Sequence, residues 1–428
     1  MKSSARIYFF VFLGVFILFI AFALQVIPWF EWSDGCEHAA AIRELNYSLL
    51  HPLNPHLNLP GETSPRYVPS IIIMAVVQKI LEYDVFTILA LSSLVAFIFL
   101  GFGIYFFAKE YFQDEIQPVY TLLSLLFLWG RGWDGANSIM FSSLVYNAYY
   151  PSVISFILIF FALTAMLKYL RQRRLSYFSA FVIVSSLAFL NHPLTGILLF
   201  FITSILIVSE GYLEKRIVIL FSLACMIAVM VTSLWPYYSF LKGVLFMASG
   251  KGRQFWDYQA GYNLHYSGHV IRIGPGFLGI LAIAYFGIKK QYPFIVAGFL
   301  ISLFIYIAGF FWKIILAERL IFLCMLFSQL AFSRMLKTSI HAPPDWIKSK
   351  WPSLLRFVYV SALGAGFFGQ LYLTGKMYLP QYVEWQPRLH VKKYLHPLQH
   401  YLSLRHYLQR GDIVLTDIGT SWILPCLT

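Results

Sequence analysis

Long apolar runs follow one another along most of the chain, separated by short polar gaps. At a rise of about 1.5 Å per residue, roughly 20 apolar residues cross the ~30 Å hydrocarbon core of a bilayer. Several runs are shorter than this and need neighbouring helices or a locally thinner bilayer. The pattern predicts an all-α polytopic membrane protein with about 11 transmembrane helices, at residues 7–30, 85–108, 117–130, 151–169, 177–191, 194–209, 216–236, 271–288, 291–312, 314–333 and 354–375.

The composition supports this assignment to a membrane. Of the 428 residues, 59% are hydrophobic and only 12% are charged, whereas soluble domains carry about 25% charged residues. The net charge of +13 would suggest nucleic acid binding in a soluble protein. Here the basic residues lie mostly in short gaps between the runs, where membrane topology and anionic lipid headgroups account for them. We therefore expect membrane lipids, and no nucleic acid, among the partners.

The basic residues also predict the orientation, because Lys and Arg are enriched in cytoplasmic loops. They precede the first run and then occupy alternate gaps: Lys2, Arg6, Lys168, Arg171, Arg173, Arg174, Lys215, Arg216, Lys289, Lys290, Arg334, Lys337, Lys348 and Lys350. This pattern predicts a multi-pass protein of the plasma membrane with a cytoplasmic N-terminus. Residues 1–375 then form a membrane domain with long outer loops at 31–84 and 237–270. Residues 376–428 form an extracytoplasmic tail that reads as the start of a truncated soluble domain.

The number and direction of the spans depend on whether the segment 67–83 crosses the membrane. If it crosses the membrane, the run at 117–130 has to be re-entrant. Gln78, Lys79 and Glu82 make its second half amphipathic, which favours a helix lying along the outer surface. The long first outer loop then carries surface helices, and all the predicted spans alternate in direction.

The first outer loop concentrates acidic residues directly after the first run. Asp34, Glu37 and His38 are spaced so that a helix with Asp34 as its N-cap places all three on one face. A carboxylate beside a second carboxylate and an imidazole can act as a general base or bind a hard cation. A capping Asp on a solvated helix face would explain the same residues without any chemistry.

Further candidate substrate-binding residues lie near the predicted outer ends of other helices. Arg66 precedes the predicted surface helix, and His192 lies in NHPLTG between two short runs. We expect Asn191 to cap the second of these helices and His192 to face an outer cavity. Arg319, in KIILAERLIF, can either hold a phosphate in forked geometry or be neutralised by Glu318.

Two more outer segments add candidates. Asp134 lies in WGRGWDGANS, where glycines let the backbone approach a ligand closely and tryptophans can stack on a sugar; a turn with interfacial aromatic residues is the alternative. Aromatic and basic residues interleave in the loop 251–272, which contains the candidate binding residues His265 and His269. On an extracytoplasmic loop, this pattern suits sugar faces and lipid phosphate.

The order of these features resembles the GT-C superfamily of integral-membrane glycosyltransferases, the type that depends on polyprenyl-phosphate sugars. The corresponding segments are SDGCEH, PRYVPSIIIMAVVQKILEYD, YFFAKEYF and GRGWDGANS, within about residues 1–210. The resemblance implies a GT-C-like fold with Asp34 as catalytic base and Asp134 as a second acid, and a divalent cation (Mg²⁺ or Mn²⁺) held by Asp34 and Asp134. The chain departs from the family in that Glu37 is three positions from Asp34 and not adjacent to it.

We therefore expect an enzyme, a membrane glycosyltransferase. It would move a sugar from a lipid-linked donor to a lipid, glycan or protein acceptor on the extracytoplasmic face. Two other classes stay open. A transporter or lipid flippase needs ionisable residues or broken helices near the midplane, and few charges lie inside the runs. A non-catalytic partner of an envelope-assembly complex would use the long outer loops as docking surfaces.

Overall fold

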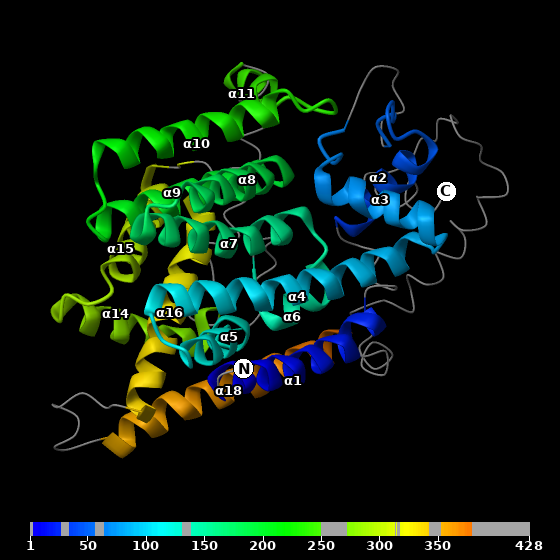
Figure 1. Cartoon of the computed structure of the whole chain (residues 1–428). Coiled ribbons are helices and arrows are strands. Elements are labelled where there is room, and N and C mark those ends of the chain that lie inside the picture. Colours follow the sequence, from blue (N-terminus) through cyan, green and yellow to red (C-terminus); the bar gives the residue numbers. More distant parts are fainter. Residues whose placement is uncertain are drawn as a thin grey trace.

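The computed structural model describes residues 3–26, 34–55, 64–130, 138–249, 272–312, 314, 317–341 and 352–378. All regular structure in these ranges is helical (Figure 1). The chain is an all-α multi-pass membrane protein, because seven of these helices are long and apolar enough to cross a bilayer. They are α1 (Ser3–Val26), α4 (Val85–Phe112), α7 (Pro151–Gln172), α10 (Lys215–Ser233), α15 (Pro293–Trp312), α16 (Ile321–His341, preceded by the 3₁₀ turn η4, Ala317–Leu320) and α18 (Pro352–Tyr378).

The four remaining predicted runs are also helical, but shorter. They contain α5 (Gln117–Phe127), α8 (Leu175–Asn191), α9 (Pro193–Ser209) and α14 (Leu278–Ile288, preceded by the 3₁₀ turn η3, Gly274–Phe277). Each packs against longer neighbours: α8 against α7 and α10, α5 against α16 and α4, α9 against α15, and α14 against α16. The short helices are therefore packed against longer helices, as their length led us to expect.

The predicted outer gaps contain further helices. These are α2 (Gly35–Tyr47), α3 (Pro69–Leu81), α6 (Phe141–Asn147) and α11 (Phe240–Ala248). The 13 residues of α3 are about 20 Å long at the α-helical rise, which is less than the hydrocarbon thickness. Figure 1 shows α2 and α3 together at one end of the bundle, where they pack on each other and on α4. The surface position of α3 stays a prediction, and its length is compatible with it.

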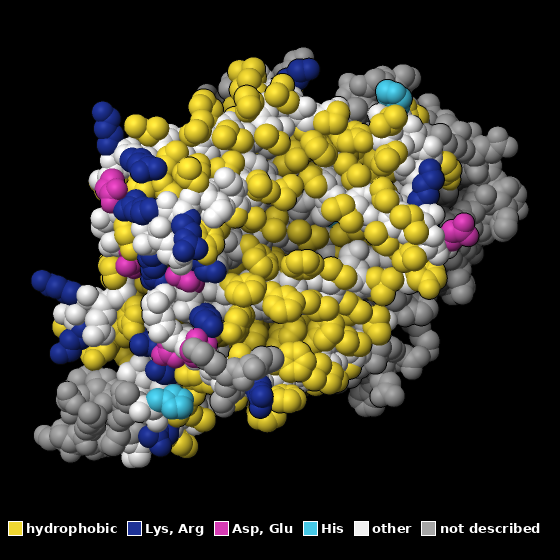
Figure 2. Space-filling model, in the orientation of Figure 1, with side chains coloured by type: hydrophobic (Ala, Val, Ile, Leu, Met, Phe, Trp, Pro, Cys, Tyr) yellow, Lys and Arg dark blue, Asp and Glu magenta, His cyan; other side chains and the backbone are white. Residues whose placement is uncertain are grey.

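Ion pairs join the helix turns at one end of the bundle, which we call the basic end. Arg334 of α16 donates to Asp114 at 2.9 Å and to the Tyr292 hydroxyl at 2.6 Å, and so links α16 to the α4–α5 and α14–α15 turns. Lys337 lies 2.6 Å from the same carboxylate. Further pairs here are Arg171–Glu110, Arg173–Glu214 and Lys109–Glu115. Figure 2 shows most of the visible Lys, Arg, Asp and Glu side chains gathered at this end, beside broad hydrophobic flanks.

The opposite end, which we call the site end, is joined by hydrogen bonds between predicted outer segments. The indole N–H of Trp235, after α10, donates to the Tyr67 carbonyl at 2.8 Å. The Tyr237 hydroxyl donates to the Leu49 carbonyl at 2.6 Å. These contacts join the segment after α10 to the segment between α2 and α3. Segments that the sequence predicts on one side of the membrane are therefore in contact with one another.

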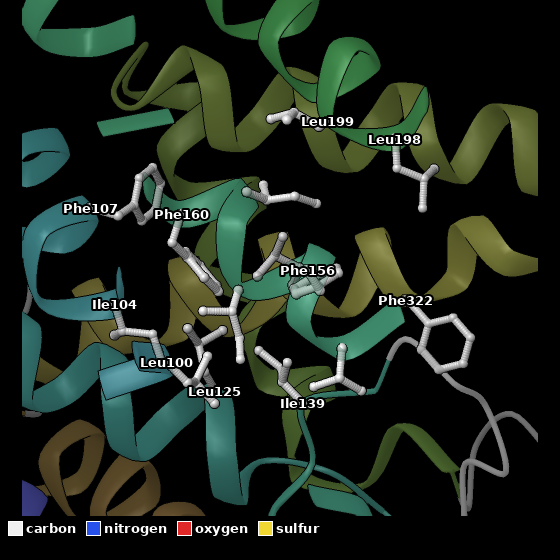
Figure 3. Packing of buried hydrophobic residues seen from close by; sticks show 14 of the residues in the cluster. Leu100, Ile104, Phe107, Leu125, Ile139, Phe156, Phe160, Leu198, Leu199 and Phe322 are labelled. Atoms are coloured by element: carbon white, nitrogen blue, oxygen red, sulfur yellow. The ribbon is translucent and has the colours of Figure 1, made fainter. Parts of the chain in front are cut away.

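The interior is filled by large apolar side chains from helices distant in sequence. Figure 3 shows residues of α4, α5, α7, α9 and α16 in contact around Phe156 and Phe160. Phe19 of α1 stacks on Phe97 of α4, with ring centroids 4.1 Å apart. In lipid, close packing of this kind drives helix association, because the surrounding tails are as apolar as the side chains.

Two glutamine side chains let the short helix α5 end inside the protein. The last carbonyls of a helix lack partners within it, and the hydrocarbon region supplies no water to satisfy them. The Gln329 amide donates to the Leu128 carbonyl at 3.0 Å, and the Gln370 amide donates to the Trp129 carbonyl at 3.2 Å. Side chains of α16 and α18 thus satisfy the carbonyl groups that follow α5.

We predict that the α14–α16 contact depends on Gly279. A methyl group at this position would overlap the Ser328 carbonyl oxygen, whereas one at Gly287 of the same helix would lie 3.7 Å from the nearest Val296 carbon. Gly279→Ala should destabilise the protein by about 1–3 kcal/mol, the usual cost of overpacking. Gly287→Ala should be neutral or slightly stabilising. Thermal unfolding in detergent measures both, and equal midpoints for the two variants would contradict the packing.

Candidate functional site

The structure brings together five predicted site residues from four separate segments at the site end. They are Glu37 and His38 on α2, Arg66 before α3, His192 between α8 and α9, and Arg319 in η4. The Arg66 guanidinium acts electrostatically on Glu37, His38 and His192, and Arg319 acts on His192. Asp34 joins the same cluster, because its charge acts on Glu37. We call these six residues the polar cluster.

Asp34 occupies the start of the predicted helix. Helix α2 begins at Gly35 with Asp34 in the N-cap position, and the Asp34 carbonyl accepts from the His38 N–H at 3.1 Å. The predicted helix and its N-cap position are therefore confirmed. The Asp34 side chain, however, makes no capping hydrogen bond. Within the described part of the chain, the Asp34 carboxylate therefore does not cap the helix that it precedes.

Glu37 differs from Asp34 because it is paired. Its carboxylate forms an ion pair with the Arg66 guanidinium. Burial raises the pKa of Glu37, Arg66 opposes this rise, and the Asp34 charge adds to it. Glu37 and Arg66 therefore neutralise each other across the α2–α3 contact, which leaves Asp34 as the better placed proton acceptor of the two predicted catalytic acids.

The two histidines of the polar cluster are neutral near pH 7. His38 is only 1% exposed, and burial, followed by the charges of Arg66 and His192, lowers its pKa well below that of a free histidine. Burial, followed by Arg319 and Arg66, lowers the pKa of His192 to about 4. His192 Nδ1 accepts from the Thr195 N–H at 3.3 Å. In a neutral imidazole, this leaves Nε2 with the proton, as a donor.

The prediction that Asn191 caps α9 is wrong. The N-cap is His192, and Asn191 is buried at the end of α8 with 4% of its surface exposed. Its side chain accepts from the Ser70 N–H at 3.0 Å and donates to the Pro151 carbonyl at 2.8 Å. Asn191 therefore ties the starts of α3 and α7 to the end of α8, and it positions the segment that carries Arg66 beside His192.

Two tyrosines form an aromatic wall that the sequence analysis did not select. The rings of Tyr149 and Tyr150, just before α7, meet the His38 imidazole edge-on, at centroid distances of 6.3 and 5.1 Å. Burial, with Tyr150 beside it, raises the pKa of the Tyr149 hydroxyl. The signal was present as two adjacent tyrosines before the helix-starting Pro151. Their contact with α2 is a tertiary feature.

Arg319 keeps part of its guanidinium unsatisfied. Its Nε atom is buried and has no hydrogen-bond partner among the described residues. The structure shows no ion pair between Arg319 and Glu318 within the described part of the chain. His38 Nδ1 is likewise buried without a described partner. An unsatisfied buried polar group costs about 1–3 kcal/mol, more when charged, so such groups are expected where a ligand completes them.

Three predicted site residues, Asp134, His265 and His269, lie outside the described residues. The predicted metal pair, Asp34 and Asp134, is therefore untested. Among the residues that the structure describes, no group of three His, Cys, Asp or Glu side chains could hold a metal ion. After the Glu37–Arg66 pair is formed, one carboxylate and one guanidinium remain in the polar cluster, and these can accept a proton and bind an anion at the same time.

Comparison with known proteins assigns no family. No protein-family model matches the chain, and no curated protein matches its sequence. The function of the polar cluster is therefore inferred from its own residues.

We predict that His192 makes stability pH-dependent. Its folded-state pKa of about 4 lies below the ~6.5 of a free histidine, so the unfolded chain binds more protons between these values. Stability should therefore fall as the pH decreases from about 6.5 towards 4. The ring is partly exposed, so we expect His192 to contribute about 1–2 kcal/mol of this loss.

The variant His192→Asn keeps a good N-cap acceptor and cannot titrate, so its unfolding midpoint should change less between pH 7 and pH 5. As a control, His341→Asn makes the same exchange at an exposed histidine at the end of α16, outside the polar cluster. Identical pH profiles for His192→Asn and the unsubstituted protein would contradict the assignment.

Proposed function

We propose that the protein is a membrane glycosyltransferase that moves a sugar from a lipid-linked phosphate donor to an acceptor hydroxyl. The observation that carries this proposal is the combination, in one cluster, of a carboxylate that does not cap its helix, Asp34, and a half-buried arginine, Arg319, whose buried Nε has no hydrogen-bond partner among the described residues. Transfer to a hydroxyl needs a proton acceptor. A departing lipid phosphate needs donors aimed at its developing charge.

The roles follow from the charges of the cluster. The acceptor oxygen attacks the sugar carbon that carries the phosphate, Asp34 takes the hydroxyl proton, and the phosphate leaves with the electron pair of the broken C–O bond. Arg319 and the Nε2–H of neutral His192 donate to the leaving phosphate. The Glu37–Arg66 pair positions α2 against α3, and the chemistry otherwise needs little more than orientation of the reactants.

The site end then faces the extracytoplasmic side of the plasma membrane. The unequal distribution of Lys and Arg between the two ends supports this orientation, because basic residues favour the cytoplasm. The GT-C resemblance of the first 210 residues supports the same arrangement, with about 11 spans. Asp134, His265 and His269 remain candidates for sugar or phosphate contacts, and Asp34 with Asp134 for a divalent cation, on the strength of the sequence.

Transport is the rival that an assay separates most simply. A transporter or flippase needs a sealed membrane to show its activity, whereas an enzyme consumes its donor in detergent. The polar cluster also lies among helix ends and interhelical turns, whereas transport sites lie near the midplane. Release of polyprenyl phosphate from polyprenyl-phosphate hexoses by the detergent-purified protein, with alcohol acceptors present, would support transferase activity.

We predict that Asp34→Asn lowers the rate of transfer by at least about 10²-fold, in the range typical of losing a general base. The matched control is Asp84→Asn. Asp84 is the N-cap of α4, where it accepts from the Phe86 and Thr87 N–H groups, and Asn caps equally well. Release of polyprenyl phosphate by purified proteins of equal thermal stability measures both. Full activity of Asp34→Asn would remove Asp34 as the base.

We predict that Arg319→Gln lowers kcat by about 10²–10³-fold, the usual effect of losing a donor to developing negative charge. Arg319→Lys should recover only part of this, because an ammonium keeps the charge but not the forked donors. Arg356→Gln is the control, since Arg356 is exposed on α18. Normal kcat for Arg319→Gln, in a protein that still melts like the unsubstituted chain, would contradict the role of Arg319.

A further inference from the structure

An open groove lies at the basic end, far from the polar cluster in the fold. It has a volume of about 440 Å³, within the ~300–1,000 Å³ range of small-molecule sites. Leu175 at the start of α8 and Ile219 and Leu220 of α10 form its apolar wall, and the side chains of Lys215 and Arg216 border it. Figure 1 shows α8 and α10 side by side.

The charge of this groove is not compensated by the protein. Five other cations described at the basic end have carboxylate partners: Lys109, Arg171, Arg173, Arg334 and Lys337. Lys215 and Arg216 are exposed, and neither forms an ion pair within the described part of the chain. The carboxylate next to them in sequence, Glu214, is paired with Arg173. Lys215 and Arg216 therefore border the groove as two cations without an ion-pair partner among the described residues, and the carboxylate next to them is engaged by Arg173.

The apolar wall of the groove continues along the outside of the bundle. Only 22% of the residues in the apolar, membrane-crossing stretch of α10 are buried, so most of its side chains face away from the bundle. The exposed Ile219, Leu223, Met226 and Met230 recur every three or four residues and form a stripe down one face. An occupant of the groove thus meets cations at one end and a lipid-facing apolar stripe at the other.

We propose that this groove binds an anionic phospholipid, with its phosphate on Lys215 and Arg216 and its acyl chains along the exposed stripe of α10. An Arg fork and a Lys ammonium suit a phosphate ester. Basic residues at a membrane surface attract anionic lipids electrostatically. The continuous apolar stripe favours a lipid over a soluble phosphate compound, because only a lipid has chains that would cover the stripe.

The test compares binding of phosphatidylglycerol and phosphatidylcholine to the detergent-purified full chain by native mass spectrometry. The groove variant is Lys215→Gln with Arg216→Gln. The matched control is Lys289→Gln with Lys290→Gln, which removes the same charge from two exposed residues of the α14–α15 turn. We expect the unsubstituted and control proteins to retain phosphatidylglycerol in preference to phosphatidylcholine. The groove variant should bind phosphatidylglycerol at least tenfold more weakly.

A charge-preserving variant, Lys215→Arg with Arg216→Lys, should bind phosphatidylglycerol within a few-fold of the unsubstituted protein. Three results would overturn the proposal. Equal losses in the groove and control variants would indicate general charge attraction. Equal retention of the two lipids would remove the headgroup preference. Displacement of phosphatidylglycerol by an excess of inorganic phosphate would indicate a site for soluble anions.

Discussion

The absence of water from the hydrocarbon core is the constraint on which this structure depends. Every backbone N–H and carbonyl there needs a partner within the protein, which makes the membrane part of the chain helical. A short helix can end at depth only where side chains satisfy its last groups. Gln329 and Gln370 do this for the carbonyls after α5, and the His192 side chain satisfies an N–H at the start of α9.

The same constraint separates the charges into two ends with different properties. At the basic end, Arg334 and Lys337 share Asp114, and three further cations, Lys109, Arg171 and Arg173, are paired with carboxylates. These interactions hold the turns between helices together. At the site end, Arg319 Nε and His38 Nδ1 are buried without partners in the described structure. Desolvated polar groups left in this state are costly, so they indicate a function more strongly than the well-paired network does.

Sequence reasoning selected all six residues of the polar cluster, because each of them lies near a helix end, where a charged side chain costs less than inside a membrane span. Offsets of three and four correctly placed Asp34, Glu37 and His38 together. The sequence could not show which residues these side chains contact. Glu37 is neutralised by Arg66, His192 and not Asn191 caps α9, and Tyr149 and Tyr150 enclose His38. Each of these facts joins segments whose separation in sequence carries no local pattern.

The sequence by itself determined the class of protein and the positions of the helices, because hydropathy and helical spacing are properties of neighbouring residues. It also determined which of the two ends is basic. Only the tertiary structure decided that the Asp34 side chain does not cap α2, that both histidines of the polar cluster are neutral, and that Lys215 and Arg216 border a groove. These properties arise from burial and from charges on helices that are distant in sequence. Both are present only after the helices have packed together.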